Sequence, residues 1–91
     1  MTTLRQLSYL VALADSRSFR RAADAVHVAQ PTLSQQLRAL EARLGVNLVE
    51  RNESPVQLTP IGRDLVTRAR RILLDVKDAE DMVRRSRAGI A

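Results

Sequence analysis

The last third of the chain limits the fold most strongly, because it lacks helix-breaking residues over a long stretch. No glycine or proline occurs between Gly62 and Gly89. Thr59 and Pro60 precede this stretch as an N-cap followed by proline, which fits the first helical position because its missing N–H would be unpaired there. We therefore expect one helix of about 28 residues, roughly 42 Å long at 1.5 Å per residue. Residues 1–58 are too few to cover a helix of that length.

Apolar residues recur along this helix in a heptad pattern. Their spacings of 4, 3, 4, 3 and 4 residues are typical of a helix that packs lengthwise against another helix. With Leu73, which widens the stripe on one side, the expected dimer interface consists of Leu65, Ala69, Ile72, Leu73, Val76, Ala79 and Val83. The alternative is that the helix folds back on its own domain. We favour self-association and interpret residues 59–88 as a linker and dimerisation helix.

Two short helices are predicted at the start of the chain. Thr3 and Gln6 have the spacing of a capping box, in which each side chain bonds to the backbone of the other residue, so a helix should cover about residues 4–15. Ser18 is an N-cap candidate for a second helix over about residues 19–25. Apolar residues recur at helical intervals in both segments, so each helix should bury one face.

A third helix follows after a short turn. Pro31 suits its first turn, and Gly45 is a natural stop at its C-terminus. Its core stripe consists of leucines at spacings of four, three and four residues, namely Leu33, Leu37, Leu40 and Leu44. Glu41 lies beside this stripe near the end of the helix, so we expect it to be a structural hydrogen-bonding group. The polar residues are left on the outer face.

From Val46 onward the hydrophobic period changes to that of strands. Residues 47–51 and 56–58 are strand-like, and the intervening sequence Asn-Glu-Ser-Pro favours a turn. These signals predict a small hairpin over about residues 47–58.

The second and third helices form a helix-turn-helix pattern over about residues 18–38, and the hairpin would add a wing. Such a unit can set its second helix into the DNA major groove. There, Gln can bond adenine bidentately, Ser can bond several base edges, and apolar atoms can touch the thymine methyl group, while helix N-termini attract phosphate. The DNA contacts expected from the two helices are Ser18, Gln30, Pro31, Thr32, Ser34, Gln35 and Arg38. By periodicity alone, an ordinary solvated surface remains the alternative.

Composition restricts the chemistry further. The chain has 91 residues, no cysteine and one histidine, which excludes disulfides, Cys-ligated zinc and His-rich metal sites, so we expect no cofactor. No apolar run approaches the roughly 20 residues of a membrane span, and we expect a cytoplasmic, nucleoid-associated protein. The net charge is +5, and every basic residue except Lys77 is arginine. Arginine favours oxyanionic partners such as nucleic acid, although an arginine-rich proteome would give the same bias.

Over about residues 3–87, the chain resembles the N-terminal DNA-binding domain of LysR-type transcriptional regulators. The residues in register with that family are Ala22-Ala23, Gln30-Pro31, Ser34, Leu40-Glu41, Leu44-Gly45, Glu50-Arg51, Leu58-Thr59 and Gly62. The resemblance implies a mainly α-helical fold, with a winged helix-turn-helix over residues 1–58 followed by a long dimerising linker helix. It also implies DNA contacts at Gln30, Pro31 and Ser34.

The resemblance further implies a role for the wing and a set of partners. The wing from Arg51 through Asn52 to Ser54 would approach the neighbouring minor groove. The partners would be double-stranded promoter or operator DNA and a second copy bound through the linker helix. A tetramer would form at full length, with RNA polymerase as a candidate partner. Family members continue into an effector domain that receives a small-molecule inducer, so we expect this chain to be a fragment without that domain.

Three residues depart from the family pattern. Ala29 replaces the usual Ser, so the third helix lacks a side-chain cap, a loss that typically costs about 0.5 to 2 kcal/mol. Gln35 stands where Arg is common, which lowers the attraction for phosphate. Glu53 places a negative charge in the wing, which argues against deep insertion of its tip. We therefore expect modest affinity for a half-site.

We interpret the chain as a DNA-binding, dimerising domain that recognises an interrupted palindromic promoter site and acts by binding. One alternative is a winged-helix module of another regulator family that works mainly through protein–protein contacts. The other is an enzyme, which is disfavoured because the acidic residues are scattered over different elements and His27 has no nucleophile beside it.

Overall fold

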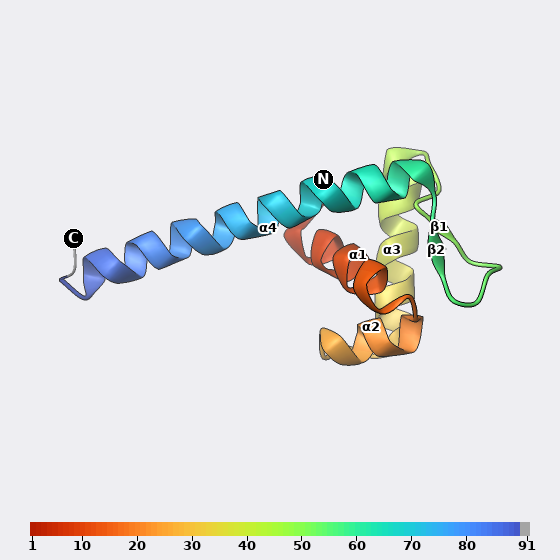
Figure 1. Cartoon of the computed structure of the whole chain (residues 1–91), viewed down its shortest axis with the longest axis horizontal. Coiled ribbons are helices and arrows are strands. Elements are labelled where there is room, and N and C mark those ends of the chain that lie inside the picture. Colours follow the sequence, from red (N-terminus) through yellow and green to blue (C-terminus); the bar gives the residue numbers. More distant parts are fainter. Residues whose placement is uncertain (90–91) are drawn as a thin grey trace.

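The computed structural model describes residues 1–89 and confirms a mainly α-helical winged helix-turn-helix with a long last helix (Figure 1). Its elements follow the order α1 (Leu4–Ser16), α2 (Phe19–Ala25), α3 (Gln30–Leu44), β1 (Val49–Glu50), β2 (Gln57–Leu58) and α4 (Pro60–Arg87). The three short helices gather beside the N-terminal half of α4, and the rest of α4 extends away from them. The molecule is therefore elongated, at 52 × 25 × 20 Å.

The helix starts follow the capping signals of the sequence. Thr3 and Gln6 form the predicted capping box, with reciprocal bonds of 3.1 Å. The hydroxyls of Ser18 and Thr59 accept backbone N–H groups at the starts of α2 and α4. Ala29 precedes α3 without any side-chain cap, as its methyl group requires. Local sequence thus sets where each helix begins.

Left-handed backbone conformations separate the three short helices. Arg17 ends α1 at φ 55°, His27 lies in the turn between α2 and α3 at φ 60°, and Gly45 ends α3 at φ 73°. Glycine adopts this region without cost, whereas Arg17 and His27 adopt it with a side chain attached. The turn at His27 lets α2 and α3 pack together, while Arg17 redirects the chain into α2 and Gly45 redirects it toward the wing.

The core lies between α1, α2, α3 and the first turns of α4. Its largest fully buried side chains are Leu10, Leu13, Leu33, Leu37, Leu40 and Leu48. Burying one leucine side chain stabilises the fold by about 1.5 to 3 kcal/mol. Ala22 and Ala23 in α2 are also buried, and their small size lets α2 approach closely.

The hairpin is shorter than the predicted strands over residues 47–51 and 56–58. Only two residue pairs match, Val49 with Leu58 and Glu50 with Gln57, in an antiparallel ladder. Flanking backbone groups bond elsewhere, because the Leu48 N–H donates to Glu41 at 2.7 Å and the Val56 N–H donates to the Arg17 carbonyl at 3.0 Å. The Leu48 carbonyl still accepts the Thr59 N–H at 3.0 Å, so contacts outside the hairpin take up the Leu48 N–H at one end and the Val56 N–H at the other.

The start of α4 is fixed to the rest of the fold by close packing. Gly62 lies against the Leu48 backbone, and Val66 and Ala69 are buried. An ion pair of 2.6 Å between Arg70 and Asp15 also joins α4 to α1, and it raises the pKa of Arg70. In the described residues, no helix is long and apolar enough to cross a membrane.

Candidate nucleic-acid interface

The predicted polar face of α3 is exposed. Leu33, Leu37 and Leu40 face the core as predicted, whereas Leu44, predicted with them, is 44% exposed at the end of the helix. Of the predicted DNA contacts on α3, Gln30, Pro31, Thr32, Gln35 and Arg38 are exposed and Ser34 is half-buried. The face therefore presents amide, hydroxyl and guanidinium groups to solvent on one rigid helix. This is an arrangement that can reach base edges in a major groove.

Ser18 differs from those residues because its side chain already has a structural partner. Its hydroxyl accepts the Arg21 N–H at 3.2 Å, and the residue is half-buried. Contact with a phosphate at this point would use the remaining capacity of the hydroxyl.

The wing divides into an exposed tip and an anchored base. Asn52, Glu53 and Ser54 at the tip are exposed. Arg51 at the base is held inward instead, with 22% of its side chain exposed, and its Nη1 donates to Glu41 at 2.6 Å. Its Cζ also lies 5.8 Å from the centre of the Phe19 ring, within the range of a cation–π contact. Arg51 thus links the wing to α2 and α3.

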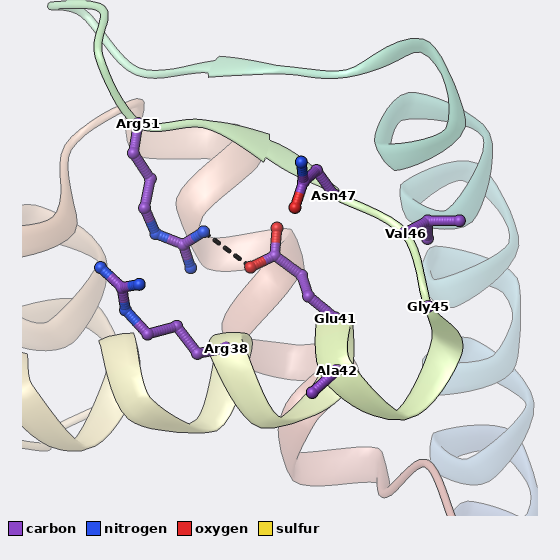
Figure 2. Close-up of a pocket in the computed structure, with 7 residues that line it drawn as sticks. All are labelled: Arg38, Glu41, Ala42, Gly45, Val46, Asn47 and Arg51. Atoms are coloured by element: carbon purple, nitrogen blue, oxygen red, sulfur yellow. Dashed lines mark hydrogen bonds and ion pairs between the residues drawn. The ribbon is translucent and has the colours of Figure 1, made fainter.

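Glu41 is the buried acceptor that joins α3 to the wing. Its Oε2 accepts the N–H groups of Leu48 at 2.7 Å and Val49 at 3.3 Å, and its Oε1 accepts from Arg51 (Figure 2). These bonds confirm the predicted structural hydrogen-bonding role. They also fix the first strand of the wing relative to the helix that carries the polar face.

A cluster of arginines beside α2 was not among the predicted site residues. Arg17, Arg20 and Arg21 line an open cavity of about 530 Å³ with Ser54 and Pro55 of the wing. Three arginines within five residues were the available signal in the sequence. Their convergence with the wing depends on the turn at Arg17 and on the path of the hairpin, neither of which has a local pattern.

The predicted dimer stripe of α4 divides along the helix. Ala69 has no exposed surface and Leu65 packs against the core. The stripe therefore contacts its own chain where α4 begins, beside the head of the molecule, which consists of α1, α2, α3 and the wing. Farther along, Leu73 and Val76 are half-buried and Ala79 is exposed. Ile72 and Val83 are 40% and 58% exposed. The folding-back alternative therefore describes the first part of α4, and a free apolar face remains on the second.

The helices and the wing match a known protein family. The model of the lysR family of bacterial regulatory helix-turn-helix proteins matches residues 4–63, which include all three short helices and the wing. The chain belongs to the LysR family. The resemblance predicted from the sequence is thereby confirmed, and the interpretations as an enzyme or as a module of another regulator family are both set aside.

Curated LysR-type relatives match the chain along most of its length. It is 54% identical over 79 residues to the DNA-binding transcriptional dual regulator OxyR of Escherichia coli strain K12, covering 87% of this chain and 26% of OxyR. It is 47% identical over 87 residues to the regulator EstR of Acinetobacter baylyi, covering 96% of this chain and 28% of EstR. The chain thus spans about a quarter of the length of these relatives.

Solved LysR-type structures agree with the fold. The BenM DNA-binding domain in complex with catB site 1 DNA matches with a TM-score of 0.94 and 39% identity, covering 99% of this chain and 97% of that one. Vibrio fischeri DarR in complex with DNA matches with a TM-score of 0.90 and 26% identity, covering 100% of this chain and 31% of that one. The chain is therefore the DNA-binding domain of a LysR-type regulator.

Proposed function

We propose that this domain places α3 in a DNA major groove and reads an interrupted palindromic promoter site as a dimer. The exposed polar face at the N-terminus of α3 carries the proposal, because it is backed by a rigid leucine core. The chain also resembles, over nearly its whole length, a BenM domain whose structure was solved in complex with DNA. This similarity supports a DNA-binding role for the same fold.

The residues at the start of α3 would contact the bases. Gln30 and Gln35 carry amides that can bond adenine bidentately, and Ser34 can bond several base edges. The Pro31 ring can contact a thymine methyl group. These side chains have no net charge, so they select a sequence and contribute little to general attraction.

Phosphate contacts set the register of the domain on the duplex. Candidates on the helices are Ser18, Thr32 and Arg38, and candidates on the wing are Arg51, Asn52 and Ser54. Glu53 lies among the wing residues, so its negative charge keeps the tip from entering deeply between phosphate strands.

The proposed dimer uses the exposed part of the α4 stripe. Ile72, Val76, Ala79 and Val83 lie on one side of the helix, with Leu73 at the edge. Pairing of this face with a second copy would hold two α3 helices for two major grooves, which is the arrangement that a palindromic site requires. Leu65 and Ala69 support the face from within the head.

Other proposed partners belong to the whole regulator. We expect a C-terminal effector domain that binds a small-molecule inducer, assembly to a tetramer, and contact with RNA polymerase at promoters. The site of action is the nucleoid in the cytoplasm. These expectations extend the family relationship to parts of the relatives that lie outside this chain.

Selection of bound sequences from random duplex DNA tests the proposal. The expected product is a consensus of two inverted half-sites. In the selected duplex, Gln30→Ala should relax recognition at one base pair in each half-site, with a loss of about 1 to 3 kcal/mol there.

Gln36→Ala is the matched control, because Gln36 lies on the same helix but bonds to Gln6 at 3.3 Å. It should leave base preference unchanged. Selection that yields no consensus, or equal weakening by Gln30→Ala on selected and scrambled DNA, would contradict the assignment of α3 as the reading helix.

A further inference from the structure

The junction of α3 and the wing brings two arginines to one cavity. Arg38 from α3 and Arg51 from the base of the wing border an open cavity of about 450 Å³. Figure 2 shows the Arg38 side chain extending toward the guanidinium of Arg51. Glu41 also lines the cavity, so two positive charges converge on a space that contains one carboxylate. The net positive charge of the side chains around the cavity favours binding of an anion.

Arg51 has an unused hydrogen-bonding edge at this junction. Its Nη1 is taken by Glu41, but its Nε and Nη2 are buried and have no partner among the described residues. These two N–H groups form the side of the guanidinium that can bind two oxygens of a phosphate in parallel. Unpaired buried donors are unfavourable, so an oxyanion at this edge would satisfy them.

Glu41 and Phe19 hold Arg51 in its orientation. Glu41 is itself fixed by the backbone N–H groups of Leu48 and Val49, and the Phe19 ring supports the guanidinium. Arg38 is exposed on α3, so its long side chain can move to admit a ligand. One arginine is therefore preorganised and the other is adjustable.

The path of DNA across the domain identifies the anion. A helix in the major groove and a wing at the adjacent minor groove lie on either side of one phosphodiester strand, which must cross the junction between them. We propose that Arg38 and Arg51 together bind one phosphate of that strand, and that Glu41 is a positioning residue that presents Arg51 to it. This inference rests on the proposed function, since it requires α3 to lie in the major groove.

Neutral methylphosphonate groups, placed one at a time along the selected duplex, test the inference. With the wild-type protein, one position on the strand between α3 and the wing should weaken binding about tenfold or more. Arg38→Gln should reduce the sensitivity at that position. Arg51→Lys should do the same, because lysine keeps a charge for Glu41 but lacks the two-donor edge. The double variant should be insensitive there.

Arg71→Gln is the control for loss of positive charge, because Arg71 is exposed on α4 away from the junction. It should keep full sensitivity at the critical phosphate. Two different positions responding separately to Arg38→Gln and Arg51→Lys would overturn the shared site, as would no response to either. If the wild-type protein bound no sequence specifically, the proposed function itself would fail.

Glu41→Gln tests the positioning role separately. It keeps an acceptor for the backbone N–H groups but removes the charge that holds Arg51. Thermal melting first checks that the Glu41→Gln protein is folded. Its binding should then respond less to a methylphosphonate at the shared phosphate, while its response to base changes opposite Gln30 persists. Uniform weakening at all phosphates and bases would show a merely structural role and overturn the assignment.

Discussion

The backbone of Gly62 in α4 packs directly against the backbone of Leu48 beside the wing. This contact fixes where the long helix leaves the head. A Cβ atom at this position would overlap the carbonyl oxygen of Leu48, which belongs to backbone and cannot swing aside. The tight fit explains why a residue with poor helix propensity occupies the third position of α4.

Gly62→Ala should destabilise the domain by about 1 to 3 kcal/mol, the usual cost of overpacking. In an exposed helix the same change would stabilise the fold by about 1 kcal/mol. Whether Gly62→Ala raises or lowers the free energy of unfolding therefore shows whether the close contact with Leu48 exists. Urea denaturation measures the difference, with Ser86→Ala on the exposed end of α4 as control. A Gly62→Ala protein as stable as the parent would rule out the close contact.

The start of α3 lacks a side-chain cap, and a hydroxyl at Ala29 would supply one. Ala29 has an extended backbone, φ −69° and ψ 145°, which suits a capping residue. Ala29→Ser should therefore stabilise the domain by about 0.5 to 2 kcal/mol, and Ser18→Ala should destabilise it by a similar amount. Thermal unfolding of both variants checks the pair. Absence of any gain from Ala29→Ser would mean that the hydroxyl does not reach the α3 N–H groups.

Single residues also show where sequence reasoning succeeds. Capping by Thr3, Ser18 and Thr59 depends on neighbours within three residues, so it could be predicted. The inward orientation of Arg51 depends on Glu41, ten positions earlier, and on Phe19 in another helix. The sequence pointed to Arg51 only through the family resemblance, and nothing local showed its ion pair.

The four helices and the polar face of α3 followed from local signals, whereas the strand lengths and the packing partner of the α4 stripe did not. The wing strands are short because Leu48 and Val56 bond to groups outside the hairpin. The heptad stripe of α4 could be read from its period, but the period does not distinguish packing within the chain from packing with a partner. Ala69 was assigned to the dimer stripe on its period, but it is buried against its own chain.

The far end of α4 carries its own ion pairs, and Asp81 is the group to measure. A hydrogen bond of 3.0 Å from Lys77 lowers the pKa of Asp81, with further attraction from Lys77, Arg84 and Arg85. A lowered folded-state pKa means that the stabilisation is present above the ordinary Asp value of about 3.9 and is lost as pH falls through the folded value.

An NMR titration of the Asp81 carboxyl should therefore give a midpoint below that of an ordinary aspartate. Lys77→Gln should move the midpoint upward, because the charged donor is gone. A midpoint that Lys77→Gln leaves unchanged would show that the pair does not form in solution.

At the scale of the whole molecule, the free apolar face of α4 predicts self-association. Ile72→Glu combined with Val76→Glu should give a monomer of 10.2 kDa by light scattering, because four facing carboxylates cannot be buried between two copies. The dimer mass should persist in Leu74→Glu, since Leu74 is 59% exposed but lies on another face of the helix. Identical masses for the parent and the double variant would refute this interface.

The distribution of charge across the molecule predicts that different residues supply affinity and specificity for DNA. The proposed base-reading residues at the start of α3 are uncharged, whereas arginines lie at the wing junction and beside α2. General attraction to DNA should therefore come from the arginines, and discrimination between sequences from α3.

Sequence-specific DNA binding by this domain can be measured as affinity for the selected duplex and for a scrambled duplex over a series of salt concentrations. For both duplexes, log K should fall linearly with log salt, by about 0.9 for each phosphate neutralised. The selected duplex should bind more tightly by roughly 10³ or more at physiological salt. Equal affinity for the two duplexes, or affinity that does not change with salt, would contradict the account of a sequence-reading DNA-binding domain.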